Sequence, residues 1–427
     1  MTRRQIFIIL GGAVAIIIVL LVFGGSGGIP TRARLVIWGV YDEPVVFQEI
    51  IDNYVKANKH ITIEYHKKSF TNYEQELINA FAADTGPDIW LIHNTWLPKH
   101  KDKIKEMPSD LFSFNIYQDT FADIVDRDLL EDGKIYGAPL YIDTLALFYN
   151  KDLLNSAGIT SPPKTWEDLI EDLDKLVVRN QWGGIDRAGV ALGTAENINR
   201  STDILSLLML QNGTKMVSDD KKRAEINQSI YLGGETYYPG QDALRFYTEF
   251  SNPTKRAYTW NRQMPYSVDA FIEGKTAMMI NYSHHIPTIK ERAPYLNFDV
   301  SPVPQIEGRE FDISYANYWA FTVSKKTKAI TEAWKFLLYL ANKDVAKKYL
   351  EITKRPAARK DLIEWQKDDD ELGVFAKQGL TARSWYQVDS NTIETILADS
   401  IKDIVLGKST IQQSIETAVD KINLLME

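Results

Sequence analysis

Aromatic rings and polar side chains gather where strands are predicted to end. Trp38–Asp42 follow the first predicted strand and His93–Trp96 follow the third, and similar groups occur at Tyr141–Thr144, Asn281–His284 and Tyr315–Tyr318. Ligands of open parallel sheets lie outside the carboxyl ends of the strands. Rings pack on the C–H faces of a sugar, and Asp and Asn side chains satisfy its hydroxyls. The pattern therefore predicts a site for a small polar solute and favours a carbohydrate.

Catalytic and metal-binding motifs are absent from the sequence. The six histidines form no H-E-x-x-H and no i, i+4 pair, neither a Walker A motif nor G-x-G-x-x-G occurs, and G-x-S-x-G occurs only within the glycine-rich stretch Gly24–Gly28. The acidic run Asp368–Glu371 is typical of a solvated loop rather than of a glycosidase pair. We therefore predict no catalytic residue, no metal and no cofactor. A surface-anchored glycosidase or lyase, and a solute-sensing accessory protein, stay open as alternatives.

Composition narrows the class of protein further. The 427 residues suggest two or three domains, and the lack of cysteine excludes disulfides. The formal net charge is -8, and residues 1–34 contain four arginines and no acid. Removing those four positive charges leaves -12 on the remaining chain, which argues against nucleic acid as a partner.

The amino-terminal segment predicts a membrane anchor. Ile6–Phe23 contains no charged or polar side chain, which is about the length that spans a bilayer. Arg3 and Arg4 precede it and favour a cytoplasmic amino terminus, so the body is expected on the extracytoplasmic side of the cell membrane. Gly24–Gly28 then read as a flexible tether. Residues 1–28 are thus expected to form a single-pass anchor with its linker, and a signal peptide cleaved at the small residues after the apolar run stays open as the alternative.

The elements that must position the strand-end residues alternate between strands and helices. A continuous apolar run predicts a buried strand at 35–38, and period-3.6 spacing predicts the helix that follows at 45–54. Alternation of this kind predicts parallel strands with right-handed crossovers. Thr165 and Asp168 match a capping box at the start of a later helix. Further strands are expected at 61–65, 88–92, 145–149, 277–280 and 320–323, and further helices at 73–83, 328–341 and 392–426.

Several segments together resemble a known family. Residues 136–154 read YGAPLYIDTLALFYNKDLL and residues 163–169 read PKTWEDL; weaker matches are GPDIW at 86–90 and FIEGKTAMMIN at 271–281. This pattern resembles extracellular solute-binding proteins of the maltose-binding-protein type, the sugar-binding components of ATP-driven importers. The resemblance extends from about residue 35 to the end of the chain.

The resemblance implies an α/β fold of two lobes joined by hinge crossings, here preceded by the single amino-terminal transmembrane helix. Lobe one is expected at residues 35–140 plus 303–343, and lobe two at residues 144–300 plus 345–427. The crossings are expected at 141–143, near 300–304 and near 342–345.

The resemblance also implies the function. A carbohydrate is captured between the lobes by hinge closure and delivered to a membrane permease of an ATP-driven importer, by a protein that is expected to be a monomer. Asp143 occupies the place of an acidic residue that bonds sugar hydroxyls, and its replacement by Ala is expected to weaken binding by about 1.5 to 3 kcal/mol. A polyamine, phosphate or peptide stays open as the solute. The candidate contacts are Tyr41, Asp42, Asn94, Trp96, Asp143, Tyr282, His284, Asn317, Tyr318 and Trp385.

Overall fold

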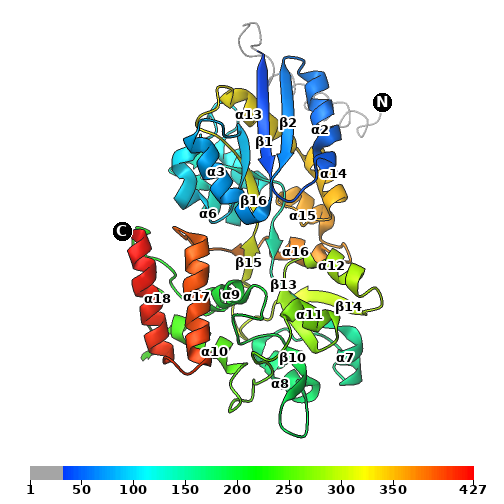
Figure 1. The fold of residues 1–427 in the computed structure, drawn as a ribbon, viewed down its shortest axis with the longest axis vertical. Helices are drawn as coiled ribbons and strands as arrows, with labels where there is room; N and C mark the ends of the chain where they lie inside the picture. The colour runs from blue at the N-terminus through cyan, green and yellow to red at the C-terminus, as the bar shows by residue number, and fades with distance from the viewer. Residues whose placement is uncertain (1–31) are drawn as a thin grey trace, which may run out of the picture.

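The computed structural model describes residues 32–427, which fold into two α/β lobes one above the other (Figure 1). The expected anchor and linker at residues 1–28 lie outside the described residues. Within residues 32–427, none of the helices combines the length and the apolar character that crossing a bilayer requires.

The first lobe contains a five-stranded sheet in the order β2-β1-β3-β16-β6. The first three strands run parallel, and β16 pairs antiparallel with β3 although the two are far apart in sequence. Ile89–Ile92 are buried, as the predicted apolar strand requires. The strands are β1 (Ala33–Gly39), β2 (Ile61–Lys67), β3 (Ile89–His93), β6 (Ala138–Pro139) and β16 (Trp319–Val323), with a small ribbon of β4 (Leu130–Glu131) and β5 (Lys134–Ile135).

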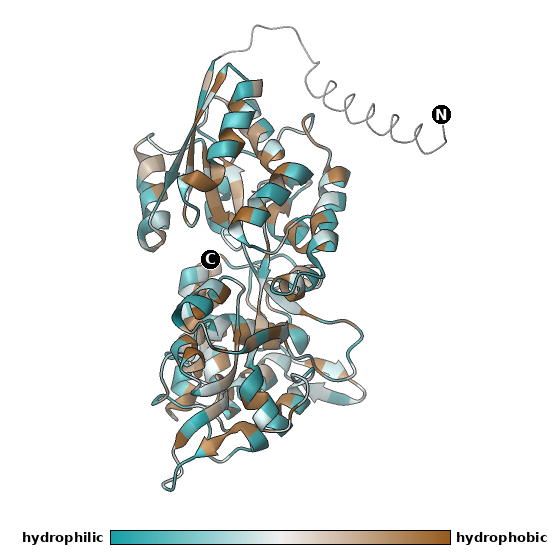
Figure 2. Ribbon diagram, turned by 90° about the vertical axis from the view of Figure 1, so that its right-hand side faces the viewer, coloured by the Kyte–Doolittle hydropathy of each residue, from teal (hydrophilic) through white to brown (hydrophobic). Residues whose placement is uncertain are grey.

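Helices cover this sheet with their apolar faces. Helix α2 buries Phe47, Ile50 and Tyr54 at the predicted helical spacing. Figure 2 shows the same alternation in colour, with hydrophobic residues along the strands and two-coloured helices around them. The helices are α2 (Pro44–Ala57), α3 (Tyr73–Ala82), α4 (Leu97–His100), α5 (Phe114–Thr120), α6 (Asp123–Leu129), α13 (Ile330–Leu340), α14 (Lys343–Thr353), α15 (Lys360–Gln366) and the short 3-10 turns η1 (Phe70–Asn72) and η2 (Lys101–Lys103).

Helices α14 and α15 differ from the expected division of the chain, which assigned residues 345–427 to the second lobe. Tyr349 and Leu350 of α14 and Ile363 of α15 belong to the hydrophobic core that surrounds the first sheet. Because their apolar faces pack in this core, the chain stays with the first lobe through α15.

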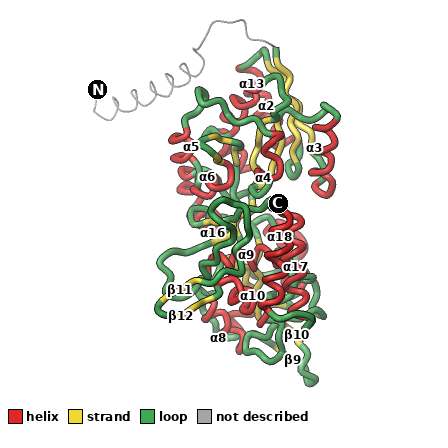
Figure 3. The backbone as a smooth tube through the Cα atoms, turned by 90° about the vertical axis from the view of Figure 1, so that its left-hand side faces the viewer, coloured by secondary structure: helices red, strands yellow, loops and turns green. Residues whose placement is uncertain are grey.

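The second lobe is built on a sheet in the order β14-β8-β13-β10-β9. All six residues of β13 are buried, and the capping box of Thr165 and Asp168 starts α8 as the sequence predicts. Helices α17 and α18 lie side by side near α9, while the hairpin of β11 and β12 projects from the lobe (Figure 3).

The elements of the second lobe complete the fold. The strands are β8 (Ala146–Asn150), β9 (Val178–Arg179), β10 (Ile185–Val190), β11 (Ile230–Leu232), β12 (Glu235–Tyr237), β13 (Thr276–Asn281) and β14 (Phe298–Pro302). The helices are α7 (Lys151–Ser156), α8 (Trp166–Leu176), α9 (Ser201–Gln211), α10 (Pro239–Glu249), α11 (Ser267–Ile272), α12 (His285–Arg292), α16 (Gly373–Gln378), α17 (Ser390–Val405) and α18 (Ile411–Met426).

A small sheet lies between the lobes, where Figure 1 shows β15 and α16. It consists of β7 (Asp143–Thr144), β15 (Ser314–Asn317) and β17 (Ala382–Arg383), in the order β17-β15-β7. The chain returns to the first lobe through β15 and not at 300–304, because buried Gln211 of α9 donates hydrogen bonds to the carbonyls of Pro304 (3.0 Å) and Ile313 (3.1 Å). These bonds hold residues 304–313 on the second lobe.

Candidate functional site

A cavity of about 740 Å³, counted with its open mouth, lies between the lobes and takes residues from both. Its first-lobe wall follows the ends of β1 and β3 and the start of β16, and its second-lobe wall follows the starts of α9 and α17. The lining residues are Tyr41, Phe70, His93, Thr95, Trp96, Arg200, Thr202, Asp203, Ser206, Tyr315, Ala316, Asn317, Trp319, Gln387, Ser390, Asn391, Ile393, Glu394 and Leu397.

The first-lobe wall is aromatic. The ring of Trp319 lies edge-on to Trp96, with centroids 4.9 Å apart, and to Tyr41, at 5.7 Å. Phe70 lies 5.8 Å from Tyr41. Tyr41 and Phe70 remain 41% and 58% exposed, whereas the two tryptophans are buried behind them. The exposed pair therefore offers ring surface to a solute, and the buried pair fixes its position.

His93 gives this wall a neutral polar group. Its Nδ1 lies 2.7 Å from the hydroxyl of Thr95, and burial lowers the pKa of His93 to about 4. The imidazole is therefore uncharged at neutral pH, and a neutral imidazole has one nitrogen that donates and one that accepts.

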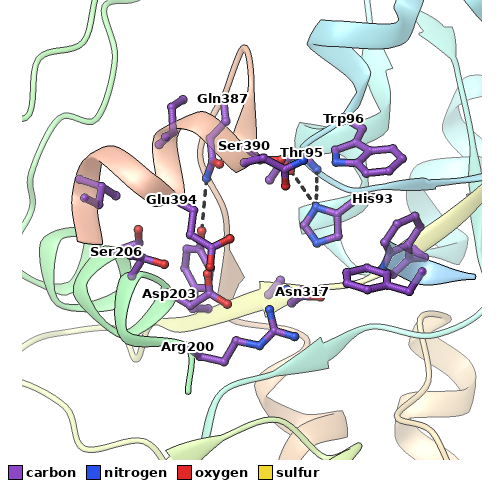
Figure 4. Close-up of a pocket in the computed structure, with 18 of the residues that line it drawn as sticks. His93, Thr95, Trp96, Arg200, Asp203, Ser206, Asn317, Gln387, Ser390 and Glu394 are labelled. Carbon is purple, nitrogen blue, oxygen red and sulfur yellow. Dashed lines mark hydrogen bonds between the residues drawn. The ribbon is translucent and has the colours of Figure 1, made fainter. Parts of the chain in front are cut away.

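The second-lobe wall is charged. Figure 4 shows Arg200, Asp203 and Glu394 facing the side that carries His93 and Trp96. The Asp203 carboxylate accepts a hydrogen bond from the hydroxyl of Tyr282 (2.8 Å), and burial raises the pKa of Asp203. Burial raises the pKa of Glu394 as well, and the nearby charge of Asp203 raises it further. Two desolvated carboxylates thus flank one guanidinium.

Tyr41, Trp96 and Asn317, among the residues singled out from the sequence, line this cavity. Asn94 and Trp385 line a second cavity between the lobes, which shares Thr95 and Gln387 with the first. Five of the ten residues expected from the sequence thus line the two cavities, and the other five line neither.

Asp42 lies just behind the first cavity in an ion pair. Its Oδ1 is 2.8 Å from Nη2 of Arg355, and its Oδ2 accepts a hydrogen bond from the hydroxyl of Tyr349 (2.9 Å). The side chain is 7% exposed. Protein donors therefore occupy the carboxylate that was expected to contact the solute.

Protein donors occupy the carboxylate of Asp143 in the same way. Its carboxylate accepts hydrogen bonds from the backbone N–H of Thr144 (2.9 Å) and of Ser283 (3.0 Å), and from the Ser283 hydroxyl (2.8 Å). His284 lies beside it, with Nδ1 3.5 Å from Oδ2, and its side chain remains half exposed outside both cavities. Asp143 thus joins the crossing strand β7 to the segment after β13.

Tyr282 and Tyr318 are fully buried and support other carboxylates. Tyr282 donates to Asp203, and the hydroxyl of Tyr318 donates to Asp128 (2.9 Å). Asn94 (3.0 Å) and the hydroxyl of Ser384 donate to Asp128 as well. Burial raises the pKa of Asp128, at the wall of the second cavity, to about 6.

Arg200, Asp203 and Glu394 were not expected from the sequence, because they lie at the starts of α9 and α17 and not at strand ends. A signal existed for the first two. Ser201-Thr202-Asp203 precede an apolar run, a pattern typical of a helix start, and a cation stands directly before it. Residues 32–427 contain no group of three or more His, Asp or Glu side chains that could hold a metal ion.

Comparisons with known proteins agree with this architecture. The model of the family described as bacterial extracellular solute-binding protein matches residues 41–347. The maltodextrin-binding protein MdxE of Bacillus subtilis (strain 168) is 30% identical over 321 residues, which cover 71% of this chain and 70% of MdxE. The galactooligosaccharide-binding protein of the same organism is 20% identical over 400 residues, 91% of this chain and 88% of that protein.

A solved structure shows the same fold. The sugar-binding protein MalE from Xanthomonas citri superposes with a TM-score of 0.77 at 21% identity, covering 92% of this chain and 97% of MalE. This likeness confirms the two-lobed α/β architecture. Because the family match spans well over half of the chain, the resemblance read from the sequence is confirmed as well: the chain belongs to the bacterial extracellular solute-binding proteins, which bind a solute for an importer and are not enzymes.

Proposed function

We propose that this protein captures a carbohydrate in the first cavity and delivers it to an ATP-driven importer when the lobes close around it. The observation that carries the proposal is the pairing of two unlike walls, aromatic from one lobe and charged from the other. A sugar ring has an apolar face and a polar rim, so it satisfies both walls at once. The relatives MdxE and MalE, named for maltodextrin and for sugar, support the same class of solute.

Closure follows from contact with both walls. A solute that touches the two lobes together only in the closed form shifts the population toward that form, and a shift from 1:99 to 99:1 requires about 5.5 kcal/mol of differential affinity. The bending points are β7, β15 and the passage after α15, where the chain changes lobes. We place the direct contacts at Tyr41, Asn317, Arg200, Asp203 and Glu394, with Trp96 supporting the aromatic wall and with Asn94 and Trp385 reached by a longer solute.

The supporting residues act one layer away from the solute. Asp42, Asp143, Tyr282, His284 and Tyr318 hold the crossing strands and the lining carboxylates in place. This assignment differs from the direct contacts expected from the sequence, because protein donors already occupy the two aspartates.

We further propose that the apolar run at 6–23 anchors a monomeric chain in the cell membrane with the body outside. Arg3 and Arg4 favour this orientation, and a tether beside the permease raises the local concentration of loaded protein. Deletion of residues 1–28 should release the protein into the medium or the soluble fraction, whereas retention in the membrane after deletion contradicts an anchor at this place.

A thermal-shift screen of the full chain in detergent micelles tests the proposal. Neutral and acidic sugars, polyamines, phosphate and amino acids are compared, and a solute at 100 times its Kd adds about 2.7 kcal/mol of stability. Calorimetry of each hit then compares Tyr41→Ala with Tyr295→Ala, because Tyr41 lines the cavity and Tyr295 is 98% exposed elsewhere. We expect an affinity loss of about tenfold for Tyr41→Ala alone. Stabilisation only by polyamines or amino acids, or equal behaviour of the two variants, contradicts the proposal.

A further inference from the structure

Arg200 occupies the N-cap position of α9, where an arginine is unfavourable. It is the N-cap of α9 in a left-handed backbone conformation (φ 63, ψ 28), which a residue with a bulky side chain rarely adopts. N-caps are normally small acceptors such as Ser or Asp, and this end of α9 has no side-chain cap hydrogen bond. A cation here also meets the positive end of the helix dipole. Local violations of this kind are typical of functional sites.

The guanidinium of Arg200 makes no direct ion pair within the described part of the chain, although Asp203 and Glu394 lie close enough for their charges to act on it. Its Nε is fully buried without any hydrogen-bond partner, and within residues 32–427 no carboxylate lies within ion-pair distance of it. Its one aromatic contact is the ring of Tyr282, with the centroid at 5.5 Å. Arg200 as a whole is only partly buried, but a buried N–H without an acceptor is costly, so the position favours a solute that supplies oxygen atoms.

The residues around Arg200 indicate what could supply these oxygen atoms. Arg200 lines the cavity, and in Figure 4 its guanidinium points into the space beside Asn317. The hydroxyl of Thr202 and the uncapped amino end of α9 lie on the same wall, and helix starts of this kind bind anions. Asp203 is already engaged by Tyr282. Glu394 lines the same cavity and opposes an anion, although burial raises the pKa of Glu394 above its usual range.

We propose that Arg200 binds an acidic oxygen group of the solute, so that the preferred substrates are acidic sugars rather than their neutral counterparts. This inference rests on the proposed function, because it names the class of carbohydrate taken by the same cavity. The sugar ring lies against the Tyr41 side of the cavity, and its acid lies between the Arg200 fork and the start of α9. A planar guanidinium suits either a carboxylate or a phosphate, since each accepts two parallel N–H bonds.

Matched sugars test the inference on the unaltered full chain. Calorimetry compares glucose with glucuronate and glucose 6-phosphate, and galactose with galacturonate and galactose 6-phosphate. We expect the acid of at least one set to bind at least tenfold more tightly than its neutral member, and the tighter acid identifies carboxylate or phosphate as the source. Equal or tighter binding of the neutral members overturns the inference and leaves the proposed function standing. If no sugar binds, acidic or neutral, both fall.

Two variants should change the affinity for acidic sugars in opposite directions. Arg200→Gln should abolish the preference for the acid, and Glu394→Gln should tighten acid binding several-fold because it removes an opposing charge. If the sugar is held as a neutral molecule, Glu394→Gln instead loses a hydroxyl acceptor and weakens binding, which contradicts the inference. Arg256→Gln is the control, because Arg256 pairs with Asp174 (2.8 Å) on the surface of the second lobe. The comparison of sugars on the unaltered protein decides the matter even if Arg200→Gln fails to fold.

Discussion

Two arginines border the cleft, and their surroundings differ. Arg355 is bound by Asp42 at 2.8 Å, by the hydroxyl of Tyr349 at 2.8 Å and by the ring of Tyr141, with the centroid at 4.4 Å. Arg200 has the ring of Tyr282, a buried Nε without a partner and no direct ion pair among the described residues, with the carboxylates of Asp203 and Glu394 nearby. A saturated polar cluster near the cleft therefore stabilises the fold, whereas an unsaturated one is left open for a solute.

Asp42→Ala tests the saturated side with the largest expected effect. Removing the carboxylate leaves the Arg355 charge buried and unpaired, so the free energy of unfolding should fall by about 3 to 5 kcal/mol. Urea unfolding of the full chain measures it. A loss below about 1 kcal/mol means that Arg355 finds another partner, and that Asp42 is not what stabilises the buried guanidinium.

Asp143→Ala should have the next largest effect. The backbone N–H and the hydroxyl of Ser283 lose their acceptor at a buried position, so the free energy of unfolding should fall by about 2 to 3 kcal/mol. Solute affinity, measured by calorimetry on the fraction that remains folded, should change little. Lost affinity with unchanged stability restores the direct contact expected from the sequence.

Asp128→Asn probes an intermediate case, a carboxylate with three donors and no cation. Burial raises the pKa of Asp128 to about 6, so the native state holds the proton more tightly than the unfolded chain does. Stability from this group is present below pH 4 and is lost as the pH rises through 6, by about 3 kcal/mol. The difference in unfolding free energy between the wild type and Asp128→Asn should therefore fall over that range. A flat difference contradicts a desolvated Asp128, and taking the difference removes the opposite trend from His93.

Arg200→Ala should have the smallest effect on stability. Because the guanidinium has no direct ion pair to lose, the free energy of unfolding without solute should stay within about 1 kcal/mol of the wild type. Thermal unfolding of both proteins measures this. A loss as large as that of Asp42→Ala shows that Arg200 is held by the fold, and the contrast between the two arginines then disappears.

The fold was largely accessible from the sequence. Apolar runs located β1, β3, β13 and β16, and the family resemblance supplied the two lobes. The limit of the first lobe was missed, because the apolar face of Tyr349 and Leu350 does not say which of two cores receives it. The anchor expected at residues 1–28 lies outside the described residues.

The site could be predicted from the sequence only in part. Strand ends pointed to Tyr41, Trp96 and Asn317, which line the cavity. Position along a strand does not say whether a side chain faces the cleft or a partner within the protein: Asp42 faces Arg355, more than three hundred residues away in sequence. Arg200 and Glu394 start helices, so a search confined to strand ends does not reach them.

The most direct test of closure around a solute measures the distance between the two lobes as solute is added. The chain has no cysteine, so Lys56→Cys on α2 and Leu424→Cys on α18 can carry a pair of spin labels, one on each lobe. Both side chains are exposed, and neither lines the cavity. We expect a saturating sugar identified in the screen to shift the distance distribution to one new population and to be recovered unchanged. An unaltered distribution at saturation, or a chemically converted sugar, contradicts the proposed function.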